Sequence, residues 1–267
     1  MIRSRFSLLG VLLAAIGLMA FFASAAQAEG EWLVLKEAGK LLTGAEIVAN
    51  KEKFEVVELE NKTGSLLGEI GTTRIDILCT ALSLIDALLT ATGGVKGESG
   101  KPPVEAKVRF TGCVFLSGGA NGLEKEQPKC QPKTNGGALG TVETLGAHAL
   151  LKLHELKDKE GKLIEKDDTL LILPDNETTQ LATTLELGAG CAFGEELPVF
   201  GHLSLQDCGG TTKALEHLLS HLATEFAPLT TLALFAQRGK LGAKNASIDG
   251  SATFKLSSDR LWAGSPK

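Results

Sequence analysis

Tyrosine is missing from this sequence, and tryptophan is scarce. The 267 residues contain no Tyr and only two Trp, Trp32 and Trp262. Rigid amphipathic aromatic side chains dominate the binding hot spots of proteins, and carbohydrate and protein recognition depend on them. The two tryptophans lie near the ends of residues 29–267, where we expect them to close the two ends of the core. The composition therefore argues against a lectin-like aromatic platform.

Common motifs of enzymes and nucleotide-binding proteins are also missing. The chain has neither G-x-G-x-x-G nor a P-loop, so its glycines are not spaced to cradle a phosphate. It also lacks H-E-x-x-H, which places two zinc ligands beside a general base. The calcium loop D-x-[DN]-x-[DN]-G is absent too. The sequence therefore predicts no cofactor, no metal ligand and no catalytic residue.

Positive charge is not in excess. The chain has 27 Lys and Arg against 32 Asp and Glu, which gives a formal net charge of −5. Nucleic-acid binding rests on the neutralisation of phosphates by Lys and Arg. A mildly acidic chain of mixed charge therefore argues against nucleic acid as a partner.

The first 28 residues predict a secretory signal peptide. Arg3 and Arg5 form a short positive region, Leu8 to Phe22 is an uncharged apolar run, and Ala26-Gln27-Ala28 is a small-x-small cleavage site. The apolar run is shorter than the roughly 20 residues that a spanning helix needs. A retained N-terminal anchor is the alternative.

Cleavage before Glu29 would remove two positive charges and no acidic residue, so that the formal net charge falls from −5 to −7. We expect residues 29–267 to form a single β-rich extracytoplasmic domain. No second apolar span follows the signal, so we expect no membrane contact after cleavage.

All five cysteines follow the predicted signal. In a secreted chain an even subset forms disulfides, and the odd cysteine is free or intermolecular. Cys113 and Cys130 are 17 positions apart, as are Cys191 and Cys208, and the first of each pair lies in a Gly-Cys-x-Phe frame. This repeat predicts disulfides Cys113–Cys130 and Cys191–Cys208, with Cys79 left as a thiol that could join two chains into a homo-oligomer. The main rival pairing joins Cys79 to Cys191.

Alternation of apolar and polar residues predicts a chain built mainly of strands. The period of two is clearest over 74–79 and 104–111. A long hairpin is expected from strands 142–156 and 163–173, with the charged tip 157–162 between them. Further strands are predicted over 31–36, 54–60, 181–187, 199–205, 229–235 and 248–256, and over 81–92, where a helix is the alternative. Strands separated by turn signals favour an antiparallel sandwich or barrel-like domain, stapled by disulfides.

One amphipathic helix is predicted near the C-terminus, over residues 212–226. Five residues form an apolar stripe at helical spacing: Leu215, Leu218, Leu219, Leu222 and Phe226. Thr212 is a suitable N-cap, and Pro228 ends the run. His217 and His221 lie four residues apart on the opposite face. Two imidazoles at this spacing can share a zinc ion, but the third ligand would have to come from elsewhere, so we interpret them as surface residues.

Serine chemistry has weak support in the sequence. Gly97-Glu98-Ser99-Gly100 is close to a nucleophile elbow but lacks its full frame. His202, Ser204 and Asp207 are close in sequence, whereas catalytic triads are recognised by their spatial geometry. His148 and His154 have no evident partner.

Several short motifs span most of residues 29–267. They are Phe110-Thr111-Gly112-Cys113 with Cys130, a Gly-rich segment around Cys191, Asp207-Cys208, Glu216-His217-Leu218, and Ser247 to Ala252 before Trp262. Their order resembles a family of uncharacterised secreted, cysteine-containing, β-rich proteins of soil actinobacteria. The resemblance implies a compact β-rich extracytoplasmic domain and carries no activity with it.

The leading hypothesis from the sequence is a secreted or cell-surface binding or structural protein without enzymatic activity, whose ligand the sequence does not name. One alternative is an extracytoplasmic hydrolase whose site is assembled from distant residues. The other is a subunit of a surface assembly, joined through an open sheet edge or the odd cysteine.

Overall fold

The computed structural model describes residues 30–36, 39–70, 72–97, 106–118, 124–134, 136–157, 163–175, 181–201, 203–209, 212–221, 232–234 and 244–265. The predicted signal peptide lies outside these ranges. In the described part of the chain, no helix is both long and apolar enough to cross a membrane.

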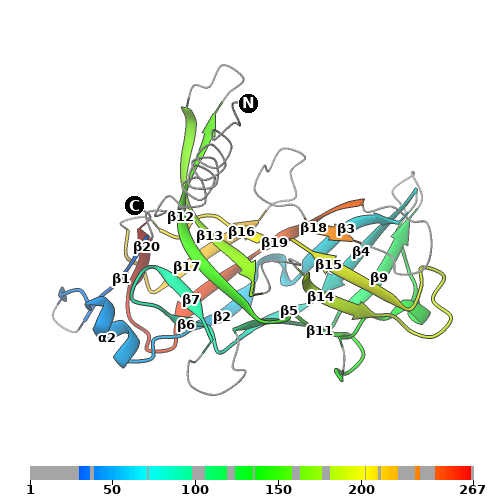
Figure 1. Cartoon of the computed structure of the whole chain (residues 1–267), viewed down its shortest axis with the longest axis horizontal. Helices are drawn as coiled ribbons and strands as arrows, with labels where there is room; N and C mark the ends of the chain where they lie inside the picture. Colours follow the sequence, from blue (N-terminus) through cyan, green and yellow to red (C-terminus); the bar gives the residue numbers. More distant parts are fainter. Residues whose placement is uncertain are drawn as a thin grey trace, which may run out of the picture.

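Strands make up most of the described structure, and all strand pairs are antiparallel (Figure 1). The strands are β1 (Glu31–Val34), β2 (Phe54–Leu59), β3 (Gly64–Ile70), β4 (Thr73–Cys79), β5 (Ala81–Ile85), β6 (Leu88–Leu89), β7 (Gly94–Lys96), β8 (Lys107–Thr111), β9 (Val114–Gly118), β10 (Glu124–Glu126), β11 (Thr141–Glu143), β12 (Ala147–Lys157), β13 (Leu163–Pro174), β14 (Leu181–Glu186), β15 (Glu196–Phe200), β16 (Leu203–Leu205), β17 (Glu216–His221), β18 (Leu232–Leu234), β19 (Lys244–Leu256) and β20 (Trp262–Ser265). Within the described ranges, one short α-helix, α2 (Gly44–Ala49), and two 3-10 helices, η2 (Glu60–Lys62) and η3 (Pro128–Cys130), join them.

Strand β19 runs through the middle of the largest sheet and connects its two halves. Its first half pairs with β3 and β18, and its second half pairs with β2 and β17. The change of partners falls at Gly250, whose φ of 146° lies in the region that favours glycine. A Cβ atom there would lie 3.2 Å from the Cα atom of Gly64. Glycine therefore lets β19 bend while two backbones approach closely.

The strands form four sheets. The largest has ten strands, with the order β10-β9-β4-β3-β19-β18-β15-β14 and with β2 and β17 added on β19. A three-stranded sheet (β11-β8-β5), a five-stranded sheet (β16-β13-β12-β7-β6) and the pair β1-β20 complete the set. They form an elongated body from which the β12–β13 hairpin projects, and they do not close into one barrel (Figure 1).

The apolar core consists of two clusters. The first gathers Trp32, Phe54 and Trp262 with residues of β7, β12 and β19. The second contains Ile75, Phe115 and Leu197 together with four of the cysteines. The prediction that the two tryptophans close two ends of the core is wrong, because β1 pairs with β20 and the two indole rings lie 6.1 Å apart in this one cluster.

A capping box fixes the first turn of helix α2. The hydroxyl of Thr43 accepts a hydrogen bond from the backbone N–H of Glu46 (3.3 Å), and the carboxylate of Glu46 accepts one from the backbone N–H of Thr43 (2.8 Å). Hydrogen bonds from Lys36 and Thr43 lower the pKa of Glu46 to about 2. The box thus stays charged, and the helix start stays capped, well into the acid range.

The predicted strands agree in large part with the structure. β12 and β13 pair over their full length, which confirms the long hairpin. β4 covers the predicted strand 74–79, and β8 covers the described part of 104–111. In the segment 81–92, residues Ala81–Ile85 and Leu88–Leu89 form strands β5 and β6. The predicted strand 199–205 is divided, because β15 pairs with β14 whereas β16 pairs with β13.

The predicted helix 212–226 is wrong over its described part. Residues Glu216–His221 form β17, which pairs residue by residue with β19. Within β17, Glu216 and Leu218 are exposed, whereas His217 and Leu219 are buried. This is the period of two of a strand, so the ladder to β19 overrides the local helical pattern. Residues 222–226 lie outside the described chain.

The predicted cysteine pairing is also wrong. The structure has the disulfides Cys79–Cys113 and Cys130–Cys191, and Cys208 is in neither. The predicted pairs, the rival pair Cys79–Cys191 and the proposed intermolecular thiol of Cys79 are therefore all corrected. The thiol of Cys208 is fully buried and lies 3.9 Å from the carbonyl oxygen of Leu205, to which it donates.

Sheet neighbours explain these pairs. Cys79 is the last residue of β4, and Cys113 directly precedes β9, which pairs with β4; their Cα atoms are 4.0 Å apart. Cys130 ends η3, and the bridge between Lys133 and Glu186 brings that turn to the loop that holds Cys191. Disulfide geometry requires neighbouring Cα atoms, and equal spacing along the chain does not provide them.

A buried carboxylate ties the segment after α2 to the segment before β20. Glu52 is 1% exposed, and its carboxylate accepts hydrogen bonds from the hydroxyl of Ser258 and the guanidinium of Arg260. A buried carboxylate needs such partners because it has lost its hydration. The interaction therefore fixes the turn that leads into Trp262.

We expect Glu52→Gln to lower the free energy of unfolding by about 2 kcal/mol, because it leaves Arg260, which is partly exposed, without its counter-charge. Urea unfolding followed by circular dichroism measures the change. The matched control is Asp259→Asn, which removes the exposed ion pair with Lys255 in the same turn and should have no measurable effect. Equal effects of the two substitutions would contradict the role given to Glu52.

Candidate functional site

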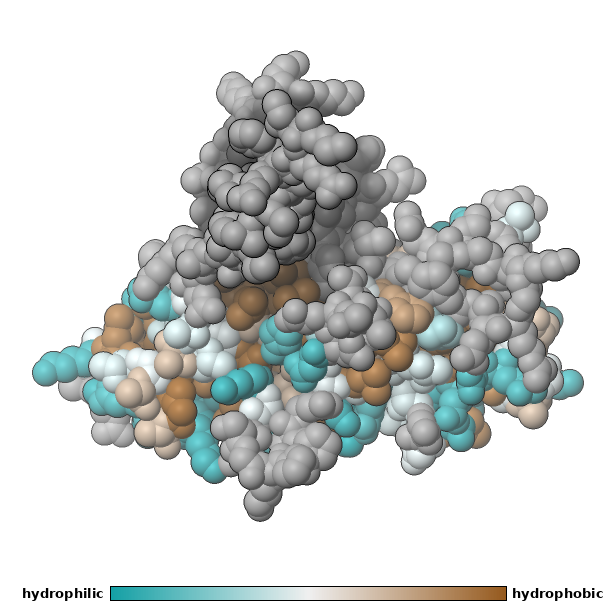
Figure 2. All heavy atoms as spheres, viewed as in Figure 1, coloured by the Kyte–Doolittle hydropathy of each residue, from teal (hydrophilic) through white to brown (hydrophobic). Residues whose placement is uncertain are grey.

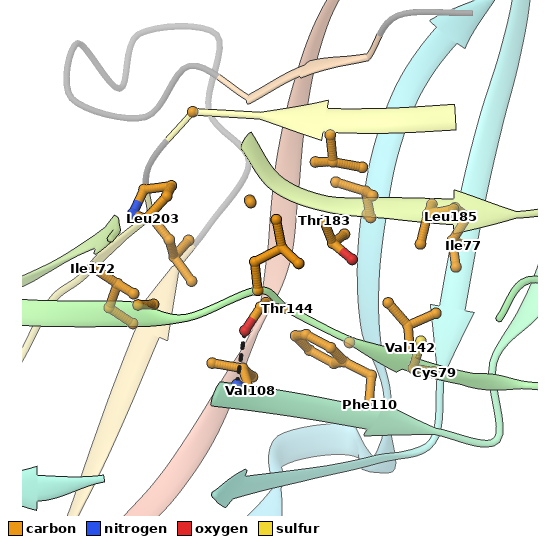
Figure 3. Close-up of a pocket in the computed structure, with 18 of the residues that line it drawn as sticks. Ile77, Cys79, Val108, Phe110, Val142, Thr144, Ile172, Thr183, Leu185 and Leu203 are labelled. Carbon is orange, nitrogen blue, oxygen red and sulfur yellow. Dashed lines mark hydrogen bonds between the residues drawn. The ribbon is translucent and has the colours of Figure 1, made fainter. Parts of the chain in front are cut away.

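An apolar cavity lies between the large sheet and the smaller sheets that face it. Its volume is about 120 Å³, and its wall is almost entirely apolar. Figure 3 shows side chains from both layers around it: Ile77 and Cys79 come from β4, Val108 and Phe110 from β8, and Leu185 from β14. Residues far apart in the sequence thus line one interior space.

A second cavity, of about 100 Å³, adjoins the first. It reaches toward the cluster of Trp32 and Trp262, since Phe54, Leu219 and Phe254 line it. Six residues belong to the walls of both cavities: Gly64, Val108, Phe110, Ala147, Ile172 and Leu203. The two cavities therefore form one elongated apolar space with a shared boundary.

Small residues create this space. The shared boundary includes Gly64 and Ala147, and the wall of the first cavity adds Gly146, Ala182 and Gly201. Larger side chains fill the two core clusters on either side. The hollow thus lies where small residues stand among the larger apolar side chains of the facing strands.

An empty cavity of this size is costly. A closed void of about 120 Å³ would cost roughly 3 kcal/mol at the penalty measured for engineered cavities. That is a large part of the 5–15 kcal/mol by which domains are usually stable. An apolar cavity of ~150 Å³ in another protein stays dry and binds benzene. Each cavity here is therefore of the size that accepts one small apolar group.

Two hydroxyl groups on the wall of the first cavity form hydrogen bonds within the protein. The Thr144 hydroxyl accepts a hydrogen bond from the backbone N–H of Val108 (3.0 Å), which Figure 3 shows as a dashed line. The Thr183 hydroxyl donates one to the carbonyl oxygen of Glu143 (2.7 Å). These bonds connect neighbouring strands, so both hydroxyls serve the fold.

Two residues with charged or titratable side chains are part of the wall of the second cavity, Lys107 and His148. The residues directly before and after each of them in the sequence also line the cavity, so the side chains of those neighbours point inward. Alternation along a strand therefore turns both side chains to the opposite face of the sheet. Consistent with this, His148 Nδ1 lies 2.9 Å from Asp175 Oδ1 at an exposed site. These two residues therefore contribute only backbone atoms to the cavity wall.

The histidine pair of the sequence analysis does not form a metal site. His217 is buried, its Nε2 atom lies 2.6 Å from the carbonyl oxygen of Trp262, and its ring packs 4.4 Å from the indole. His217 and His221 belong to one strand, so their Cα atoms are about 13 Å apart. The prediction of an exposed His217 is wrong. Among the described residues, no group of three His, Cys, Asp or Glu could hold a metal ion.

The serine and histidine candidates are only partly placed. Ser99 and His202 lie outside the described residues, and so do the side chains of His154, Ser204 and His221. Asp207 is described, with a positive φ of 68° in the turn before Cys208. The structure instead pairs His148 with Asp175, which the sequence analysis missed because the two lie 27 residues apart.

Hydrophilic residues are not gathered in one region of the visible surface (Figure 2). In Figure 2, hydrophilic residues of the described chain are scattered along the whole length of the body, between apolar ones. Exposed ion pairs such as Arg109 with Glu143 contribute to this mixture.

Comparisons with known proteins add no relative. The family resemblance described above stays a prediction. No family model, no curated protein and no solved structure matches the chain.

Proposed function

We propose that this protein is a secreted or cell-surface binding protein that holds a small apolar ligand between its sheets. The observation that supports the proposal is the pair of adjoining apolar cavities at the middle of the body. Small-molecule sites in proteins are usually concave, largely preformed and lined by apolar side chains. A ligand there would replace the contacts that the small wall residues leave unmade, and would offset the cost of the void.

The location outside the cytoplasm rests on two supports. The sequence predicts a signal peptide over residues 1–28, and the folded chain has two disulfides. Disulfides persist in oxidising compartments and are rare in the cytosol. The proposal therefore places the binding function in the periplasm, at the cell surface or in the medium.

Toluene tests the site, because its ring matches the benzene-sized cavity. We expect saturable binding, with methyl NMR shifts confined to wall residues such as Val108, Leu185 and Leu203. Ala147→Leu places a larger side chain at the shared boundary and should weaken toluene binding at least about tenfold, because an extra buried side chain takes the volume that the ligand needs. The measurement is a two-dimensional carbon–proton NMR titration of the purified oxidised protein.

Ala138→Leu is the matched control, because it makes the same change at an exposed position away from both cavities. It should bind toluene as the wild type does. Absence of saturable binding to the wild type, or equal binding by Ala147→Leu and wild type, would show that the cavities are not the binding site. Circular dichroism of both variants separates loss of binding from loss of folding.

A further inference from the structure

We infer that the cavities select uncharged ligands, so that the group they hold is a neutral hydrocarbon and any charged group is excluded. The inference rests on the proposed function and names the chemical class of its ligand. It follows from the absence of a counter-charge in the wall and from the hydrogen bonds that the polar atoms of the wall already form within the protein.

The wall offers a ligand few hydrogen bonds. Of its hydroxyls, those of Thr144 and Thr183 are bonded to backbone groups of neighbouring strands. The hydroxyl of Ser65 donates to Asp76 Oδ2 (3.3 Å), on the face of β3 and β4 opposite Leu66 and Ile77. A ligand group that took the place of Val108 N–H at Thr144, or of the Glu143 carbonyl at Thr183, would break one of these bonds, and the protein would lose that contact in exchange.

The wall also offers no counter-charge. Lys107 and His148 contribute backbone to it, while their side chains point to the opposite face of the sheet. His148 has its own partner in Asp175 there. The carboxylate of Asp76 lies behind β4, on the side away from Ile77 and the first cavity. A carboxylate or ammonium group inside the cavities would therefore be desolvated without an ion to pair with.

Desolvation of an unpaired charge is the largest penalty that binding can meet. Its effective cost in proteins is several kcal/mol, so a charged analogue of a neutral ligand should bind at least about 100-fold more weakly. The neutral analogue loses nothing comparable, because its polar surface in water is small. Charge is therefore the property on which these cavities discriminate most strongly.

A set of ligands with one ring and different charge tests the inference. Toluene, benzoate and benzylammonium are titrated at pH 7 into the oxidised full chain, with the same carbon–proton NMR measurement for all three. We expect toluene to bind and the two ions to bind at least about 100-fold more weakly. In a second titration, at a pH below its own pKa, benzoic acid should bind more tightly than benzoate does at pH 7, because the acid is then neutral and loses only the hydration of an uncharged carboxyl group.

The outcomes separate the inference from the function on which it rests. If toluene itself does not bind at pH 7, the proposed function fails. If toluene, benzoate and benzylammonium bind with similar affinities, the cavities bind ligands but do not select by charge, and the inference is wrong. If benzoate binds weakly and benzoic acid remains equally weak while toluene binds at the same low pH, then shape and not charge excludes it, which also overturns the inference.

Discussion

Replacing Trp262 with alanine is expected to lower the free energy of unfolding by about 4 kcal/mol, which is typical of the loss of a buried tryptophan. The indole is fully buried, and it lies 4.8 Å from the ring of Phe54 and 4.4 Å from that of His217. Both contacts join segments that are distant in the sequence. The substitution thus removes the side chain that holds β20 against β2 and β17. Urea unfolding measures the effect.

Two controls accompany this prediction. Leu261→Ala changes the neighbouring residue, which is 41% exposed, and should cost less than about 1 kcal/mol. Trp262→Phe keeps an aromatic ring and should cost clearly less than Trp262→Ala. Far-ultraviolet circular dichroism should follow the transition, because the chain has only two tryptophans and the substitution removes one fluorophore. A loss below 1 kcal/mol for Trp262→Ala would contradict the central position given to this residue.

The double substitution Cys130→Ala with Cys191→Ala is expected to cost about 4 kcal/mol. The disulfide closes a loop with a sequence separation of 61, and in the chain-entropy model a long closed loop strongly restricts the unfolded chain. Chemical unfolding of the oxidised proteins compares variant and wild type. Cys208→Ala is the control, since Cys208 belongs to neither disulfide. It should leave two disulfides intact and should cost much less.

Peptide mapping without reduction tests the pairing itself. We expect one linked pair of peptides that contains Cys79 and Cys113, and another that contains Cys130 and Cys191. Alkylation should reach Cys208 only after unfolding, because the residue is 0% exposed. A peptide that links Cys113 to Cys130 would restore the pairing expected from the repeated spacing and would contradict the structure.

Much of the strand pattern could be predicted from the sequence, because alternation is a local signal. The strand 74–79 can be predicted from the alternation of its own side chains, and the long hairpin from the alternation of its two strands and the turn residues between them. β4 and the β12–β13 pair confirm both. A strand with one face toward apolar neighbours carries its period in its own residues, whichever partner it meets.

The helix prediction failed because the leucines of 215–226 fit one face of a helix, and the local pattern did not show that 216–221 could also form a strand. Leu215, Leu218 and Leu219 fall on one helical stripe, yet in the structure the first two are exposed and Leu219 is buried. Pairing of β17 with β19 decided between the two periods. That pairing joins residues more than 25 positions apart, so no local pattern could indicate it.

The sequence by itself determined that the chain is mainly β and that an even subset of its cysteines forms disulfides. Only the tertiary structure decided which cysteines are joined, because that depends on which strands are neighbours. Only the tertiary structure could show the cavities, because the small residues in their walls, such as Gly64 and Ala147, come from segments far apart in the sequence. The alternation of apolar and polar residues predicts which side chains of a strand face inward. The size of a cavity between two inward faces depends on which side chains of the facing sheet lie opposite, and sheet packing determines that.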